Sequence, residues 1–263
     1  MTRIRPLLPL AALALVSACA SAPPPPPSPP VFTFEQKLGW ILHLEDARVL
    51  REVEPIPAPA PPQPEPGRRQ RAGLSPPPVY PDLLTLLDDH DPRLRRRAAI
   101  AIGRVGLAAG VDPLVGRLED PDPDVRTMVA FALGLIGDRR AADGLVRALA
   151  GDADPRVRGR AADALGRLGD PQHAGAIARL AREVMDHGAL AAIADDELGY
   201  PLAPEVEAFR LALYALVRLK AWDGLAAAVL DGAGQPRSRW WPVAYALQRI
   251  EDPRAGPALR TLA

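Results

Sequence analysis

Few residues of this chain have the types and the spacing that catalysis requires. The four histidines lie in unrelated segments, at His43, His90, His173 and His187. Of these, only His187, beside Asp186 and near the acidic run 195–197, could join a metal site. We interpret that run as a solvated acidic loop, with a metal site as the alternative. No glycine-rich phosphate loop, nucleophile elbow or His-Glu ligand pair occurs. We therefore expect no catalytic residue, no metal, no cofactor and a protein that is not an enzyme.

The single cysteine, Cys19, is the residue with the clearest chemistry. Arg3 and Arg5 precede an apolar run, 7–16, and small residues then lead to Cys19. This order of charged region, short apolar region and small-residue cleavage site indicates a secretory signal, which is too short to span a membrane.

The sequence Val16-Ser17-Ala18-Cys19 resembles the lipobox of bacterial lipoproteins. The resemblance implies that residues 1–18 are a signal peptide and that Cys19 carries lipid, while an ordinary cleaved signal is the alternative. Ala20 replaces the Asp that favours inner-membrane retention in some bacteria. We therefore expect a cell-envelope protein, anchored in the outer membrane and facing the periplasm.

The composition argues against a nucleic-acid partner and favours a helical fold. Basic and acidic residues balance at 32 each, so no overall field attracts the chain to nucleic acid. Aromatic residues make up only 5% of the chain, and the apolar content is mostly Ala and Leu, which favours closely packed helices.

The N-terminal third contains two proline-rich tracts. We assign residues 19–33 to a spacer and 55–78 to a proline-rich and basic linker, because such tracts form semi-rigid polyproline helices. Between them, residues 34–54 have the apolar spacing of an amphipathic helix. A single helix cannot bury its apolar face, so it docks on the rest of the chain, on a partner or on the membrane.

Residues 79–263 repeat themselves. The segments that begin Asp91-Pro92, Asp122-Pro123 and Asp154-Pro155 each run through an Ala-rich stretch to a Gly. With two degenerate copies, equivalent positions are 31, 32, 51 and 31 residues apart. Such a period indicates stacked supersecondary units.

Each unit predicts two antiparallel helices. The Asp caps the first helix, Pro takes its first position, and Gly106, Gly137 and Gly169 provide a left-handed stop. We predict an all-α, right-handed α-solenoid of about five such units. Leu83, Leu84 and Leu87 indicate an unpaired second helix at its N-terminal end.

The pattern Asp-Pro-x-Val-Arg, followed by Ala-Ala-x-Ala-Leu-Gly-x-Leu-Gly-Asp, resembles the short HEAT repeats also called phycobilisome-lyase-type HEAT-like repeats. The resemblance implies mostly binding proteins, with few enzymes among them. It leaves a bilin-lyase-like protein as a remote alternative. A further alternative is the N-terminal repeat region of a larger envelope enzyme, such as a peptidyl-prolyl isomerase.

Arg95, Arg126 and Arg158 occupy matching positions beside the apolar stripe. In such repeats these arginines commonly bond the Asp-containing turn of a neighbouring unit, and we expect that structural role. A ladder of anion-binding side chains is the alternative.

The second half of the array is irregular. Residues 183–203 form an insertion, and aromatic residues concentrate nearby. Alignment pairs Phe209 with Trp240 and Tyr214 with Tyr245. The candidate partner-binding residues are Tyr200, Phe209, Tyr214, Trp240, Trp241 and Tyr245. Packing between irregular repeats and an exposed ligand surface are both open interpretations.

Together these features predict a lipid-anchored envelope scaffold that binds a protein or peptide through its solenoid. The chain stops at Ala263 within a second helix and without an evident polar cap. An apolar end of this kind predicts a docked partner, a homodimer or a longer chain.

Overall fold

The computed structural model describes residues 32–51, 81–199 and 201–263, which all belong to one compact unit, Phe32–Ala263. The predictions for the signal peptide, Cys19, the proline-rich tracts and Tyr200 lie outside these residues. Within the described segments, no helix is long and apolar enough to cross a membrane.

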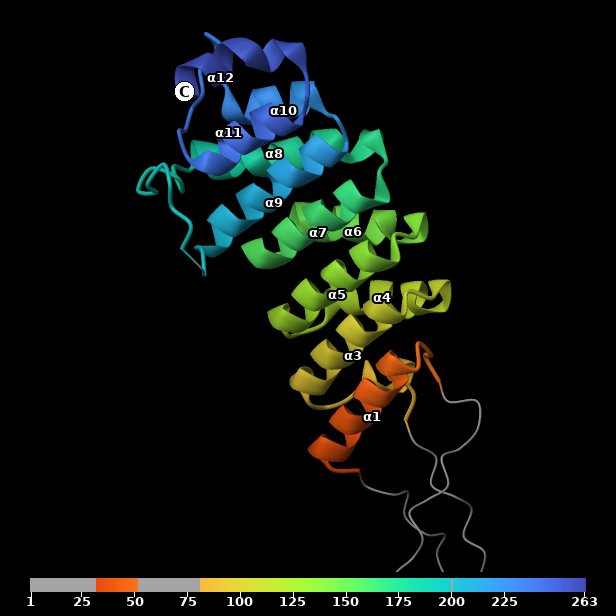
Figure 1. Ribbon diagram of the computed structural model, residues 1–263. Coiled ribbons are helices and arrows are strands. Elements are labelled where there is room, and N and C mark those ends of the chain that lie inside the picture. The colour runs from red at the N-terminus through yellow and green to blue at the C-terminus, as the bar shows by residue number, and fades with distance from the viewer. Residues whose placement is uncertain (1–31, 52–80, 200) are drawn as a thin grey trace, which may run out of the picture. The chain divides into compact units, whose positions relative to one another are not determined.

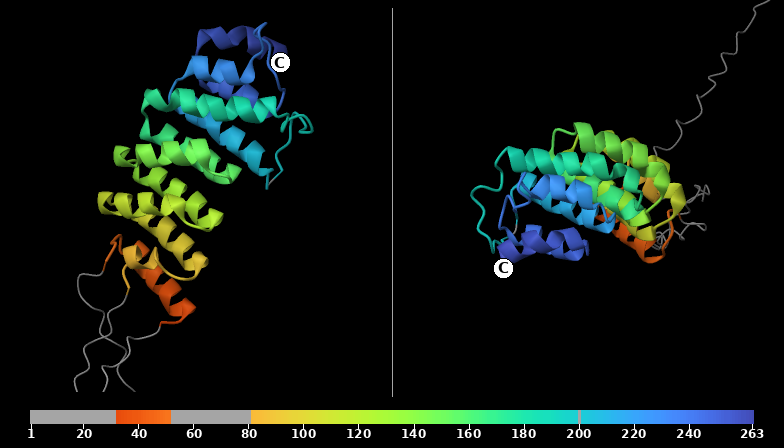
Figure 2. Two further views of the ribbon diagram at one scale, coloured as in Figure 1. Left: turned by 180° about the vertical axis from the view of Figure 1, so that it is seen from behind. Right: turned by 90° about the horizontal axis from the view of Figure 1, so that it is seen from above.

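The helices form two rows that run along the stack (Figure 1). The first row contains α3 (Pro92–Val105), α5 (Pro123–Ile136), α7 (Pro155–Leu168), α9 (Pro204–Arg218) and α11 (Trp241–Arg249). The second row contains α4 (Val111–Gly116), α6 (Ala142–Gly151), α8 (Ala174–Asp186), α10 (Trp222–Val229) and α12 (Gly256–Leu262). Both rows are visible from behind and from above in Figure 2. The prediction of an all-α HEAT-like solenoid is confirmed.

Local sequence sets the ends of the first-row helices. The carboxylates of Asp91, Asp122 and Asp154 accept hydrogen bonds from backbone N–H groups of the first turn. Gly106, Gly137 and Gly169 end the same helices with φ of 77°, 73° and 73°, a conformation that glycine adopts without strain. Short 3₁₀ turns at Ala108–Gly110, Arg139–Ala141 and Pro171–His173 then lead into the second row.

Small residues set the spacing between first-row helices. A Cβ atom added to Gly103 would lie 2.7 Å from Cα of Ala132, and one added to Gly166 would lie 2.7 Å from Cα of Ala215. The backbones therefore approach as closely as only glycine permits. In α9 the equivalent position is Val217, so this close approach is absent between α9 and α11.

The N-terminal helix α1 (Phe34–Asp46) packs against α3, which is the first of its three predicted docking modes. It ends at Asp46 rather than at residue 54. Its cap is Thr33, and Lys37 lies four residues later, as Arg95 does after Asp91. Lys37 Nζ contacts Asp89 at 2.5 Å. α1 therefore takes the place of a first-row helix.

The second helix of this N-terminal unit is α2 (Leu83–Leu86). Leu83 N–H donates to the Leu50 carbonyl at 3.0 Å, which joins the two parts across the undescribed residues 52–80. The prediction of an unpaired α2 is therefore wrong, because α1 supplies the first helix of the same unit.

Turns follow α8 through the 183–203 insertion. Residues 187–192 and 195–196 form these turns. The backbone N–H of Trp241 donates to the Asp195 carbonyl at 2.8 Å, so the insertion is attached to the start of α11.

The final helix differs from the expected apolar end. Pro257, Arg260 and Thr261 are exposed, and no large hydrophobic side chain of α12 is among the exposed ones in the described chain. Arg239 Nη1 donates to the Thr261 carbonyl at 3.1 Å. The segment before α11 therefore supplies polar contacts at the end of α12.

Candidate partner-binding surface

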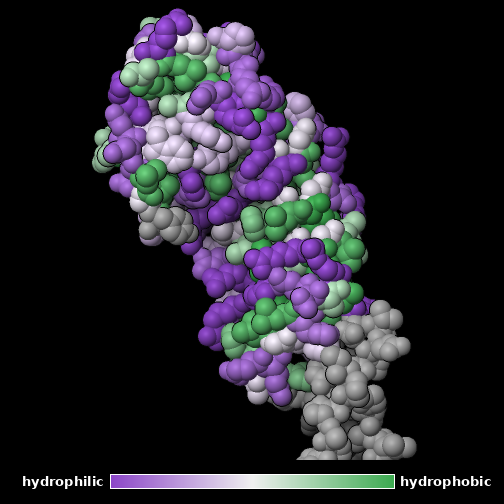
Figure 3. All heavy atoms as spheres, viewed as in Figure 1, coloured by the Kyte–Doolittle hydropathy of each residue, from purple (hydrophilic) through white to green (hydrophobic). Residues whose placement is uncertain are grey.

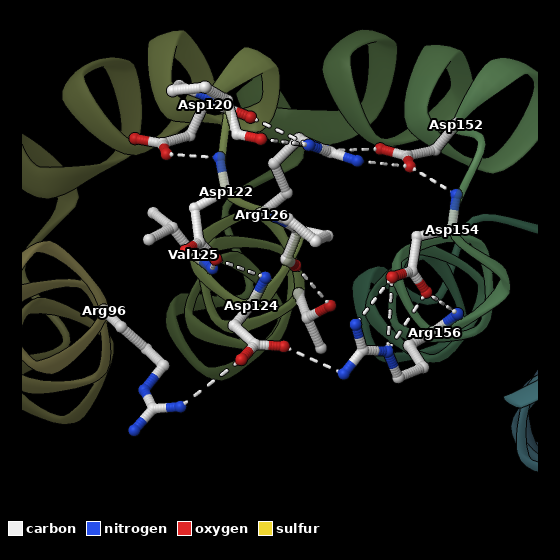
Figure 4. A network of polar contacts seen from close by, with 12 residues as sticks. Arg96, Asp120, Asp122, Asp124, Val125, Arg126, Asp152, Asp154 and Arg156 are labelled. Atoms are coloured by element: carbon white, nitrogen blue, oxygen red, sulfur yellow. Dashed lines mark hydrogen bonds and ion pairs between the residues drawn. The ribbon is translucent and has the colours of Figure 1, made fainter. Parts of the chain in front are cut away.

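The repeated arginines join consecutive units. Arg95 Nε and Nη2 donate to the two carboxylate oxygens of Asp120, each at 2.8 Å, and Nη1 donates to the Asp89 carbonyl at 2.9 Å. Arg126 repeats this geometry with Asp152 at 2.8 Å and with the Asp120 carbonyl at 2.9 Å. Figure 4 shows the Arg126 guanidinium between these two acidic turns.

The third arginine departs from this pattern. Arg158 Nε donates to the Leu149 carbonyl at 3.1 Å, and Nη2 donates to Glu183 of α8 at 2.5 Å. The acidic partner therefore comes from the second-row helix itself, where the 183–203 insertion begins.

Burial and hydrogen bonds fix the charge state of the first pair. The side chain of Asp120 is 0% exposed and that of Arg95 is 11% exposed. Burial alone would raise the pKa of Asp120, but hydrogen bonds from Arg95 and from the Asp122 N–H lower it below the ordinary 3.8. The guanidinium groups of Arg95 and Arg126 donate to carboxylates and carbonyls of two acidic turns, and this geometry gives them a structural role between repeats.

Five aromatic side chains on α9, on α11 and on the residue before α11 form a continuous group, which we call the aromatic cluster: Phe209, Tyr214, Trp240, Trp241 and Tyr245. Phe209 stacks on Trp240 with 6.4 Å between ring centroids. Tyr214 meets Tyr245 edge-on at 5.6 Å. The two pairs lie as the repeat alignment places them.

The inner pair of the aromatic cluster is core. Phe209 and Trp240 are 0% and 1% exposed, at the position that Arg95 and Arg126 occupy in earlier repeats. They stack on each other across the interface of α9 and α11. The structure therefore places these two candidates in packing between repeats rather than on a ligand surface.

The outer three rings reach the surface. Tyr245 is 44% exposed, and Tyr214 and Trp241 are half-buried. Trp241 meets Tyr245 edge-on at 6.3 Å, and the Arg210 guanidinium lies 5.8 Å from the Tyr214 ring centroid. Partial burial raises the pKa of Tyr214, so its hydroxyl remains a neutral donor at physiological pH.

The insertion makes hydrogen bonds to two rings of the cluster. The indole N–H groups of Trp240 and Trp241 both donate to the Glu197 carbonyl, at 3.1 Å and 2.9 Å. Arg239 also lies 3.4 Å from the Asp195 carboxylate. These contacts fix the position of the Trp241 side chain.

On the face that Figure 3 shows, hydrophobic and hydrophilic side chains alternate along the stack. Tyr, Trp and Arg are the residue types that dominate binding energy at protein interfaces. A partly buried ring triad can bind an apolar side chain of a partner. In the part of the chain that the structure describes, no group of His, Cys, Asp and Glu side chains could hold a metal ion, and His187 is exposed.

Comparisons with known proteins identify the repeats. A family model described as HEAT repeats matches residues 69–126 and 111–194. The chain is a HEAT-repeat protein. The comparison with curated proteins found no match.

One solved structure supports the type of HEAT repeat. The complex of CpcE and CpcF of phycocyanin lyase from Nostoc sp. PCC7120 matches with 27% identity and a TM-score of 0.52, over 78% of this chain and 73% of that chain. An engineered protein matches with 20% identity and a TM-score of 0.39, over 68% of this chain and 77% of that chain. The phycobilisome-lyase type expected from the repeat pattern is confirmed.

The lyase match overturns one expectation. The sequence predicted a protein that is not an enzyme, because it contains no catalytic constellation. The matched structure is a complex of a phycocyanin lyase, so an array of this type belongs to an enzyme, and the prediction is wrong. The absence of a local motif was insufficient evidence, since a chain can contribute to an enzyme through its surface.

Sequence reasoning also missed part of the HEAT array. The Thr33 and Lys37 pair marks α1 as a first-row helix, and its four-residue spacing was readable in the sequence. Leu44 and Ile102 are equivalent positions of neighbouring units, but they are 58 residues apart. This distance is nearly twice the repeat period, so the periodicity did not reveal the relationship.

Proposed function

We propose that this HEAT-repeat protein is a lipid-anchored envelope scaffold that binds a partner protein through the outer rings of the aromatic cluster. The comparisons support a repeat-based scaffold or a bilin-lyase-like role. The partly exposed triad of Tyr214, Trp241 and Tyr245 carries the proposal, because it brings three rigid aromatic side chains to the surface at one place.

Binding through this surface is tested by crosslinking in cells. The double variant Tyr214→Ala, Tyr245→Ala removes two outer rings and leaves Phe209 and Trp240 in the core. Leu107→Ala with Leu135→Ala is the matched control, because both leucines are exposed at 47% and 37%. We expect the tyrosine variant to lose the captured partner and the leucine variant to retain it. Equal capture by two folded variants would contradict the proposal.

Anchoring is a separate part of the proposal and rests on Cys19. The proposed lipid at Cys19 includes two or more acyl chains, which stable anchoring needs. It would hold the chain on the periplasmic face of the outer membrane. The variant Cys19→Ser is expected to move the protein from the membrane fraction to the soluble fraction. Unchanged fractionation, with no lipid found on the mature wild-type chain by mass spectrometry, would contradict it.

A second candidate is a role as a subunit of a bilin-lyase-like enzyme, favoured by the match to the phycocyanin lyase complex. Such a role requires binding of a linear tetrapyrrole. Titration of the purified chain with a bilin, followed by visible absorption, tests it directly. A saturable spectral change favours this candidate, and an unchanged spectrum removes it.

A further inference from the structure

We propose that the second row carries an independent interaction surface that binds an acidic, amphipathic segment of a partner protein. This second-row basic surface consists of Arg139, Arg147, Arg179 and Arg182, together with the hollow beside Arg147. It lies on helices other than those of the aromatic cluster.

Ion pairing differs between the two rows. Each arginine of α3, α5, α7, α9 and α11 has a carboxylate partner, and the longest of these contacts, from Arg160 to Glu207, is 3.9 Å. By contrast, Arg139, Arg147, Arg179 and Arg182 are exposed and form no ion pair with any described residue. Their positive charge is available to a ligand.

The repeat geometry brings these side chains to adjacent helices. Arg147 and Arg179 each lie nine residues after the Asp that caps the preceding 3₁₀ turn, Asp138 and Asp170. Equal repeat positions are neighbours along a solenoid, and α6 packs against α8, as the view from behind shows (Figure 2). Arg182 follows Arg179 at a spacing that shares one helical face.

A hollow with a volume of about 400 Å³ adjoins Arg147. Its apolar lining comes from both neighbouring units, with Val115, Leu118, Gly144 and Ala148. A Cβ atom on Gly144 would lie 2.9 Å from Leu118 Cδ1, so glycine allows α6 to approach the preceding unit. The hollow can receive an apolar side chain from a ligand whose acidic groups reach the arginines.

The charge pattern favours a protein segment over a membrane. Asp143 on α6 and Glu119 at the edge of the hollow are exposed and lie among the arginines. A uniformly anionic lipid surface would be repelled by these carboxylates. An amphipathic peptide can place its own carboxylates opposite the arginines and its apolar side chains in the hollow.

The test uses the mature chain and a fluorescein-labelled helical peptide with Glu and Leu on opposite faces. Arg147→Glu combined with Arg179→Glu is expected to weaken binding about tenfold or more, because attraction becomes repulsion at two sites. Binding by the wild type is expected to weaken as salt rises. In a second variant, Gly151→Leu, the new side chain fills part of the hollow and is expected to weaken peptide binding. Gly151 lines the hollow, and nothing lies within 4 Å of a Cβ atom added there.

The matched control is Arg249→Glu with Arg260→Glu, which changes the net charge equally on the last repeat. The control is expected to bind the peptide as the wild type does. Absence of peptide binding, or an equal loss in the control, would overturn the proposal. Binding to anionic vesicles but not to the peptide, lost with Arg147 and Arg179, would also overturn it in favour of a membrane. The crosslinking experiment with the Tyr214→Ala, Tyr245→Ala variant tests the aromatic cluster separately, so either proposal can fail while the other stands.

Discussion

At the scale of residues, the array is joined by buried ion pairs whose two members come from different helices. Arg95 and Asp120 are the most buried example, with 11% and 0% of their side chains exposed. Desolvating both charges has a large cost that their hydrogen bonds offset. Removal of one partner should therefore have a far larger effect than removal of a surface pair.

The variant Arg95→Met is expected to lower the free energy of unfolding by about 3 kcal/mol, because the Asp120 carboxylate remains buried without its cation. Arg156→Met is the control, since Arg156 and Asp124 are 44% and 49% exposed, and its effect should stay below about 1 kcal/mol. Urea unfolding followed by circular dichroism measures both. Similar losses in the two variants would refute the structural role of the Arg95 pair.

Acid is expected to destabilise the array through the same carboxylates. Although burial opposes it, the Arg95 hydrogen bonds lower the pKa of Asp120 below 3.8 in the folded state. The stabilisation is therefore complete above the ordinary pKa and disappears as pH falls from about 4 through the lowered value. Urea unfolding across this range should show a weaker acid dependence in Asp120→Asn than in the wild type. An identical dependence would argue against this carboxylate as a cause.

At the scale of elements, glycine and alanine determine how closely first-row helices pack. The interface of α7 and α9 contains Gly159 against Ala208 and Gly166 against Ala215. α9 lacks glycine at the next equivalent position, and aromatic rings fill the space before α11. In the degenerate repeats, contacts between aromatic rings therefore replace the contacts between glycine and alanine.

Gly166→Ala is expected to destabilise the protein by about 1–3 kcal/mol, because the new Cβ would lie 2.7 Å from backbone atoms of α9. Gly39→Ala on α1 should have the opposite sign and stabilise by up to about 1 kcal/mol, since nothing lies within 4 Å of its added Cβ. Thermal melting of the two variants gives the comparison. A stabilising Gly166→Ala would show that α7 and α9 can separate without cost.

At the scale of the whole molecule, a solenoid is stabilised mainly by contacts between neighbouring units. The unit of α11 and α12 meets the preceding unit through the interface of α9 and α11, where the rings of the aromatic cluster pack against one another. Three of the four tryptophans, Trp222, Trp240 and Trp241, lie in the last two units, so tryptophan fluorescence reports this end of the array.

We expect the C-terminal units to unfold first. In a Trp40→Phe background, the urea midpoint from tryptophan fluorescence should lie below the midpoint from far-ultraviolet circular dichroism, which reports all helices. Coincident transitions would mean that the ring-filled interface couples its units as strongly as the glycine interfaces do.

The sequence by itself determined the repeat unit, because capping, helix-stop and apolar-stripe signals are local and recur at a fixed period. Asp154, Pro155 and Gly169 specify one helix without reference to any other part of the chain. The membership of α1 in the array, the burial of Phe209 and Trp240, and the exposure of Tyr245 depended on the tertiary structure. Each is a property of the distance between helices from different units, which no single segment encodes. The unpaired arginines of α6 and α8 were recognised for the same reason. Whether an arginine has a carboxylate partner depends on the positions of all neighbouring helices.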